Sequence, residues 1–138
     1  MLKLQEYNTY VEQEILALYN SVRWTNYTSQ PQILEIAYKN SLYILAAYVD
    51  SKLVGIIRAV GDGSSIVFLQ DLIVLPEYQR KGIGTRLMKS TLDKFARTYQ
   101  IVLLTEKTEK NICFYRSLGL LNVENIGCSA FIVHRFLN

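Results

Sequence analysis

Glycines and cations occur together at one point near the middle of the chain. The segment from Gln79 to Gly84 reads Gln-Arg-Lys-Gly-Ile-Gly. Gly82 and Gly84 carry no Cβ, so an anionic ligand can approach their backbone closely, and Arg80 and Lys81 place positive charge beside them. This combination is typical of a phosphate-binding turn, although it also suits an ordinary surface connection with solvated cations.

The sequence on either side of this turn favours the phosphate interpretation. The run from Ser65 to Leu75 is mostly apolar and β-branched, and it predicts a strand that ends at Pro76. Beyond the turn, apolar residues recur at helical spacing and predict a helix from Lys81 to Thr98. The turn would then lie at a helix N-terminus, where unpaired amides and the backbone dipole attract anions.

Two common phosphate loops do not fit this segment. It lacks the Gly-Lys-Ser/Thr of a Walker A loop, and Leu87 stands where a dinucleotide loop has its third glycine. The segment instead resembles the Gln/Arg-x-x-Gly-x-Gly/Ala motif of the GNAT superfamily of acetyl-CoA-dependent N-acyltransferases, with Gln79, Gly82 and Gly84 at the defining positions.

A second stretch carries the same resemblance. Residues 108–120 are similar to a later helix of the family that ends in Phe/Leu-Tyr-x-x-x-Gly-Phe, and Tyr115 occupies its tyrosine. The resemblance implies that Tyr115 protonates the departing thiolate of CoA. A phenol with a pKa of about 10 stays protonated at neutral pH and can serve as that acid. Two positions depart from the family pattern, because Thr108 replaces an Asn and Leu120 replaces an aromatic residue.

The resemblance also implies how acetyl-CoA, the acetyl donor, would be held. Main-chain groups of the strand before the turn would bind the pantetheine arm, and amides of the turn would bind the diphosphate. The predicted cofactor-binding residues are Leu72, Ile73, Val74, Gln79, Arg80, Lys81, Gly82, Ile83, Gly84 and Thr85. The implied reaction is direct attack of a primary amine on the thioester within a ternary complex, without a covalent enzyme intermediate.

The amine must lose a proton before it attacks, and Asp71 is the residue predicted to bind or deprotonate it. A carboxylate in an otherwise apolar run is unusual, although Asp71 could also point outward or cap a loop. Phe68 stands where some GNAT members carry a catalytic Glu, so that assignment does not transfer. Trp24 and Tyr27 are the predicted substrate-binding residues, because aromatic rings suit an aryl-alkyl amine or a cation. Packing over the first helix is the alternative for Trp24.

Composition limits the other possibilities. A chain of 138 residues, half of them hydrophobic, is expected to form one domain over its whole length. The net charge of +3 is dispersed, which argues against a nucleic-acid partner. Two cysteines without CxxC spacing and one histidine do not make a metal site, and both cysteines are expected to be reduced core residues. No long apolar stretch predicts a signal peptide or membrane span, so a cytoplasmic protein is expected, with a homodimer possible.

The expected fold is α/β with the GNAT element order β, α, α, β, β, β, α, β, α, β, β: a mixed, mostly antiparallel sheet of about six or seven strands flanked by about four helices. The predicted strands are 2–7, 41–50, 53–60, 65–75, 101–104, 120–123 and 130–136. The predicted helices start at Thr9 as N-cap, near Pro31, at Lys81 and at Thr108, and residues 24–28 are predicted to form a loop. A non-catalytic CoA-binding sensor and a small RNA-binding domain are the alternative functions.

Overall fold

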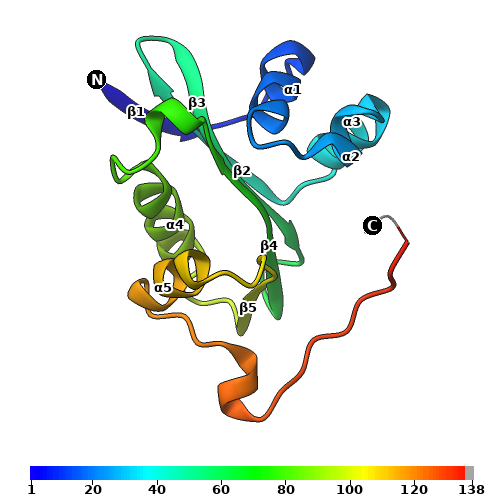
Figure 1. The fold of residues 1–138 in the computed structure, drawn as a ribbon, viewed down its shortest axis with the longest axis vertical. Coiled ribbons are helices and arrows are strands. Elements are labelled where there is room, and N and C mark those ends of the chain that lie inside the picture. The colour runs from blue at the N-terminus through cyan, green and yellow to red at the C-terminus, as the bar shows by residue number, and fades with distance from the viewer. Residues whose placement is uncertain (136–138) are drawn as a thin grey trace. The chain divides into compact units, whose positions relative to one another are not determined.

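The computed structural model describes residues 1–135, and its contacts divide the chain into two units, Met1–Leu104 and the residues from Thr105 onward. The described part of the first unit contains one five-stranded sheet in the order β1-β2-β3-β4-β5 (Figure 1). The strands are β1 (Leu2–Glu6), β2 (Tyr43–Val49), β3 (Lys52–Gly61), β4 (Ile66–Val74) and β5 (Gln100–Leu103). All neighbouring pairs are antiparallel except β4 and β5. The predicted mixed, mostly antiparallel sheet is confirmed.

Helices lie on both faces of this sheet. Figure 1 shows α1 (Glu12–Ser21), α2 (Thr25–Thr28) and α3 (Pro31–Lys39) on one side and α4 (Ile83–Lys94) on the other. The side chains of Ile83 and Leu87 on α4 are buried against β3 at Gly55. A Cβ at Gly55 would stand 3.3 Å from Leu87 Cδ1, so glycine at this position allows the helix to approach the strand closely.

The crossover from β4 through α4 to β5 agrees with the sequence prediction. The apolar run before the turn forms β4, and α4 begins at Ile83, two residues after the predicted start. Residues 66–69 of β4 pair in parallel with residues 100–103 of β5. The turn between β4 and α4 is therefore held between a central strand and a helix.

Two local predictions in the first unit were wrong. Val11, and not Thr9, is the N-cap of α1, and its side chain makes no capping bond. The phenol of Tyr7, four residues earlier, accepts the N–H of Val11 at 3.1 Å and so holds the residue at which the helix begins. Residues 25–28, predicted to lie in a loop, form α2, in which the amide of Tyr27 donates to the carbonyl of Trp24.

The second unit contains α5 (Glu109–Ser117) and a 3₁₀ turn, η2 (Val123–Ile126). Thr108 caps α5, since its Oγ1 accepts the Asn111 N–H at 3.1 Å, and Gly119 ends it with a φ of +90°. This confirms the predicted helix start and stop.

The predicted strands 120–123 and 130–136 were wrong for the described residues, which contain no strand after Leu103; Phe136 lies outside them. Asn122 caps η2 through Oδ1, which accepts the Glu124 N–H at 3.1 Å. β-Propensity alone does not make a strand without a paired neighbour. The described sheet thus has fewer strands than predicted.

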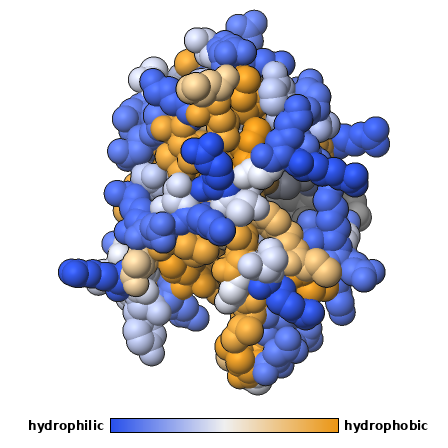
Figure 2. All heavy atoms as spheres, turned by 90° about the vertical axis from the view of Figure 1, so that its left-hand side faces the viewer, coloured by the Kyte–Doolittle hydropathy of each residue, from blue (hydrophilic) through white to orange (hydrophobic). Residues whose placement is uncertain are grey.

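The surface of the described chain is mixed in character. Figure 2 shows the side on which α4 lies, where hydrophobic patches are visible between hydrophilic side chains. Cys113 and Cys128 are unpaired and exposed, so the prediction that they are core residues was wrong. No helix of residues 1–135 is long and apolar enough to cross a bilayer.

Candidate active site

The glycine turn has the backbone geometry of an open helix N-terminus. Gly82 is the N-cap of α4 with a φ of 82°, a left-handed conformation that favours glycine. A Cβ placed on Gly82 would meet no protein atom within 4 Å. The first turn of α4 contains no acidic residue. The space beside these amides is therefore open and free of competing carboxylates.

Positive charge surrounds this turn. The ammonium groups of Lys81 and Lys52 lie 5.4 Å and 5.6 Å from the ring centroid of Tyr78. Within the described chain, neither lysine forms an ion pair, and the same holds for Arg80 and Arg86. The turn can therefore attract an anion without first breaking a salt bridge.

The side chain of Gln79 connects the turn to the end of β4. Its Nε2 donates to the carbonyl oxygen of Val74 at 2.9 Å. This residue was predicted to contact the cofactor; in the structure its amide group fixes the path of the turn.

Part of β4 has a free edge. β4 pairs with β3 as far as Val74, but it pairs with β5 only from Ile66 to Leu69. From Gln70 to Val74 the outer edge has no strand beside it in the described chain. This edge contains the predicted residues 72–74 and runs toward the glycine turn. An extended ligand can hydrogen-bond to such an edge as an added strand does.

The free edge begins at an irregularity in the strand. In the register between β3 and β4, Arg58 faces Asp71 and Ala59 faces Leu69, which leaves Gln70 as an extra residue. This is a β-bulge on β4. Sequence analysis did not anticipate it, because a change in pairing register leaves no sign in a mostly apolar run.

Asp71 lies at the bulge in a buried polar cluster. Its Oδ2 accepts hydrogen bonds from the Tyr19 hydroxyl at 2.6 Å and from Arg58 Nε at 2.8 Å. The hydroxyls of Tyr19 and Tyr38 are 3.0 Å apart, and an Arg58 NH group donates to Ser41 Oγ at 3.2 Å. Asp71 and Arg58 are only 3% and 5% exposed. We refer to Asp71, Arg58, Tyr19 and Tyr38 as the Asp71 cluster.

The charges in this cluster follow from its environment. Burial raises the pKa of the Tyr19 phenol, and the nearby negative charge of Asp71 raises it further. Burial likewise raises the pKa of Tyr38. Burial would lower the pKa of Arg58, but the charge of Asp71, its hydrogen bond and the neighbouring phenols of Tyr19 and Tyr38 together outweigh burial, so the pKa is raised. The phenols therefore stay neutral and the guanidinium stays charged at neutral pH.

The predicted acceptor residues lie beside this cluster. The rings of Trp24 and Tyr27 contact the ring of Tyr19, with centroids 6.0 Å and 5.4 Å away. The Tyr27 hydroxyl accepts a hydrogen bond from Gln70 Nε2 at 3.2 Å. The structure thus brings Trp24, Tyr27 and Asp71 into one region. Sequence analysis missed Tyr19, Arg58 and Gln70, although an arginine in the apolar run of β3 was a usable signal.

Tyr115, the predicted acid, belongs to the second unit. It lies on α5, and its ring contacts that of Phe114 with centroids 5.0 Å apart. Burial raises the pKa of its phenol, and a hydrogen bond with Thr105 opposes that shift without cancelling it. Tyr115 therefore carries its proton at neutral pH.

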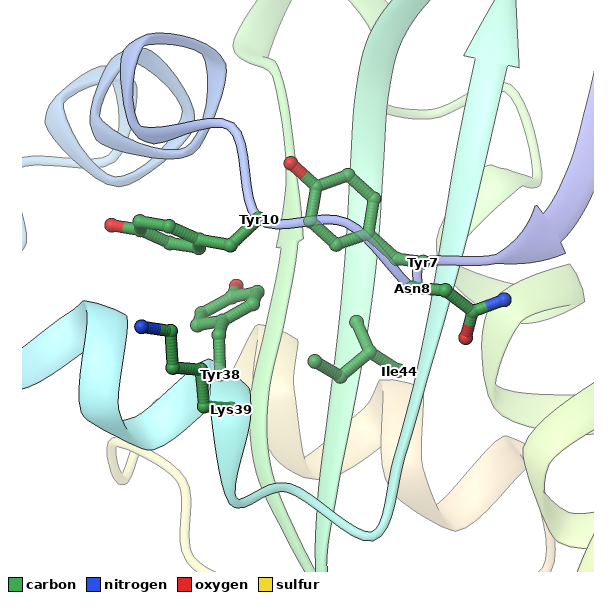
Figure 3. A pocket seen from close by; sticks show the side chains of 6 residues that line it. All are labelled: Tyr7, Asn8, Tyr10, Tyr38, Lys39 and Ile44. Atoms are coloured by element: carbon green, nitrogen blue, oxygen red, sulfur yellow. The ribbon is translucent and has the colours of Figure 1, made fainter.

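Two cavities are lined mainly by other residues, although Tyr38 of the Asp71 cluster borders the first. A cavity of about 50 Å³ is surrounded by the rings of Tyr7, Tyr10 and Tyr38 (Figure 3), and a wider one of about 330 Å³ lies between β1 and the start of α1. Neither is lined by the glycine turn, Trp24 or Tyr27. The first is too small for most ligands.

Among the described residues, no three His, Cys, Asp or Glu side chains are grouped so that they could hold a metal ion.

Comparisons with known proteins find related sequences and structures. The sequence model of the Acetyltransferase (GNAT) family matches residues 10–120. A solved GNAT-family acetyltransferase from Streptococcus pneumoniae is 44% identical, with a TM-score of 0.89 over 99% of this chain and 100% of that one. An uncharacterised N-acetyltransferase of Pyropia yezoensis, ycf52, is 28% identical over 78% of this chain, which spans only 63% of that relative.

A more distant solved structure shares the fold. The PaiA N-acetyltransferase of Thermoplasma acidophilum, solved in complex with coenzyme A, is 17% identical with a TM-score of 0.68 over 86% of this chain and 88% of that one.

Proposed function

Because this chain belongs to the acetyltransferase (GNAT) family, we propose that it transfers the acetyl group of acetyl-CoA to a primary amine of a small molecule or peptide. The observation that carries this proposal is the continuous surface formed by the free edge of β4 and the left-handed glycine turn. Along residues 70–74 no strand of the described chain lies on the outer edge of β4, and this edge leads toward an open helix N-terminus. The amides of an extended ligand can pair with the strand edge, and phosphates at the end of that ligand can bind at the helix N-terminus.

The residues present fit coenzyme A. Backbone groups of Leu72, Ile73 and Val74 would pair with the amides of the pantetheine arm. Backbone amides from Arg80 to Thr85 would bind the diphosphate, and the unpaired cations of the turn would compensate its charge. Coenzyme A supplies the acetyl group as a thioester, which is already activated toward amines.

The reaction needs few groups from the protein. The nitrogen of a neutral amine attacks the carbonyl carbon, an amide bond forms, and the carbon–sulfur bond breaks. The sulfur leaves with a proton, which we assign to Tyr115 because its raised pKa keeps the phenol protonated. The proton lost by the amine passes to a base or to solvent.

The acceptor would bind beside α2. Trp24 is 38% exposed and Tyr27 is half-buried, so their rings can contact a ligand at the surface. Aromatic rings suit the apolar part of an amine and attract its cation.

An acceptor panel tests the proposal. Acetyl-CoA is mixed with the protein and with amines of different class, including arylalkylamines, polyamines, aminoglycosides and peptides, and the free thiol is measured. We expect thiol release with at least one amine, and a rise in melting temperature on adding acetyl-CoA that CoA also produces. Absence of any thermal shift would refute coenzyme binding. A shift without thiol release on any amine would instead favour a non-catalytic CoA-binding module.

A further inference from the structure

The Asp71 cluster lies where the strand pairing changes. Arg58 and Asp71 are cross-strand partners on β3 and β4, and the register shifts immediately after them. Buried ion pairs contribute little net stability, because the cost of desolvating both charges offsets their attraction. The position of this pair beside a bulge therefore suggests a role in geometry.

The bulge decides which face of the sheet Asp71 occupies. A Cβ at Gly55 would point at α4, so by strand alternation Ala59 and its partner Leu69 face α4 as well. Without this bulge, with Gln70 paired as a regular strand residue, Asp71 would lie on the α4 face together with Leu69. With it, Asp71 lies on the opposite face, within hydrogen-bonding distance of Tyr19 on α1. The hydrogen bonds of the cluster can form only when Gln70 is extruded.

We propose that Asp71 is a positioning residue that locks the β4 bulge through Arg58 and the phenols of Tyr19 and Tyr38. The locked bulge sets the start of the free edge of β4. It also fixes Gln70, whose side chain holds Tyr27 on α2. This inference rests on the proposed function, in which acetyl-CoA binds along the free edge of β4 and the acceptor amine binds beside the ring of Tyr27.

The geometry favours this role over proton abstraction by Asp71. Its Oδ2 is already occupied by two donors, and one of them is a cation at 2.8 Å. A base and a positioning residue differ in a measurable way. Loss of a general base slows turnover of a protonated amine but not of an amine that is already neutral. Loss of a positioning residue slows turnover of both.

Three variants make the test. Tyr19→Phe removes one hydroxyl from the cluster and keeps the ring, and Asp71→Asn keeps the shape of the carboxylate and removes its charge. The matched control is Tyr7→Phe, because the Tyr7 phenol also donates to a carboxylate, Glu14, at 2.7 Å but does not touch Asp71. Each variant is assayed with an alkylamine, which is protonated at neutral pH, and with an arylamine of low pKa.

We expect Tyr19→Phe and Asp71→Asn to lower kcat about 10- to 100-fold with both amines. The pH midpoints of the kcat/KM profile should be unchanged, and the Kd for CoA should be similar to that of Tyr7→Phe. If the defect of Asp71→Asn disappears with the arylamine, or if its acidic limb in the profile is lost, Asp71 is the base and the proposal is overturned. The proposal is also overturned if Tyr19→Phe and Asp71→Asn have the same kcat and KM as Tyr7→Phe.

Amide hydrogen exchange provides a readout that needs no turnover. We expect the amides of Asp71 and Ile73, which pair with β3 beside the bulge, to exchange faster in Tyr19→Phe than in Tyr7→Phe. Equal exchange in the two variants overturns the proposal even if Asp71→Asn fails to fold. If the natural protein transfers no acetyl group but the exchange difference is seen, the proposed function fails while the locking of the bulge stands.

Discussion

Replacing Gly82 with alanine separates its two possible roles, backbone conformation and access for the ligand. Gly63, in the turn between β3 and β4, is a matched control, because its φ of 78° is close to the 82° of Gly82 and an added Cβ would make only ordinary contact with Leu42. A left-handed conformation costs an L-residue about 1–2 kcal/mol. The stiffer unfolded chain offsets about 0.4–1 kcal/mol of that. We therefore expect each variant to lose about 1 kcal/mol of unfolding free energy, or roughly 4 °C in Tm.

The effect on the ligand should differ between the two variants. The Cβ of Gly82→Ala would enter space that no protein atom occupies within 4 Å, which is the space assigned to the diphosphate. Displacing one charge-assisted hydrogen bond between an amide and a phosphate costs about 1.5–3 kcal/mol. That loss corresponds to a Kd for CoA about 10- to 100-fold weaker. Gly63→Ala should bind CoA as the natural protein does.

Titration calorimetry with CoA measures the affinities, and thermal unfolding measures the stabilities. If Gly82→Ala and Gly63→Ala lose equal stability and bind CoA equally well, the reasoning about access to the turn is refuted. If Gly82→Ala alone loses several kcal/mol of stability, the space beside it is not open and the geometric argument fails.

Two further predictions concern the phenols. Tyr115→Phe should lower kcat about 100-fold or more while the Kd for CoA stays unchanged; equal turnover at every pH would remove Tyr115 as the acid. Burial raises the pKa of Tyr38 in the folded chain. The resulting contribution to the free energy of unfolding is fully present at neutral pH, and it falls once the pH exceeds the pKa of about 10 that the phenol has in the unfolded chain. Melting temperatures measured from neutral pH to pH ~11 should therefore fall less steeply in Tyr38→Phe than in the natural protein; parallel curves would contradict this.

Local patterns were sufficient to predict most of the first unit. The apolar run of β4, the two glycines and the helical spacing after Ile83 are short-range signals, and each element formed close to its expected residues. The parallel strand β5 followed from the crossover that these elements require. The free edge that we propose as the binding site of coenzyme A is a consequence of this topology.

The Asp71 cluster could not be predicted in the same way. Tyr19 and Asp71 are separated by 52 positions and meet through their hydroxyl and carboxylate only because Gln70 is extruded. Strand alternation read from sequence assumes an unbroken register, so it places Asp71 on the wrong face. The start of α1 was misplaced for a different reason: Thr9 has a side chain suited to capping, but the helix begins after Val11, whose amide donates to the Tyr7 phenol four residues earlier.

The exposed edge of β4 also has a consequence for the protein without its ligand. An unpaired strand edge can accept a strand from another polypeptide, and residues 70–74 contain no lysine or proline to discourage such an addition. A bound coenzyme arm would cover the same hydrogen-bonding groups. Binding of acetyl-CoA would therefore protect the chain against aggregation and also supply the acetyl group for the proposed transfer.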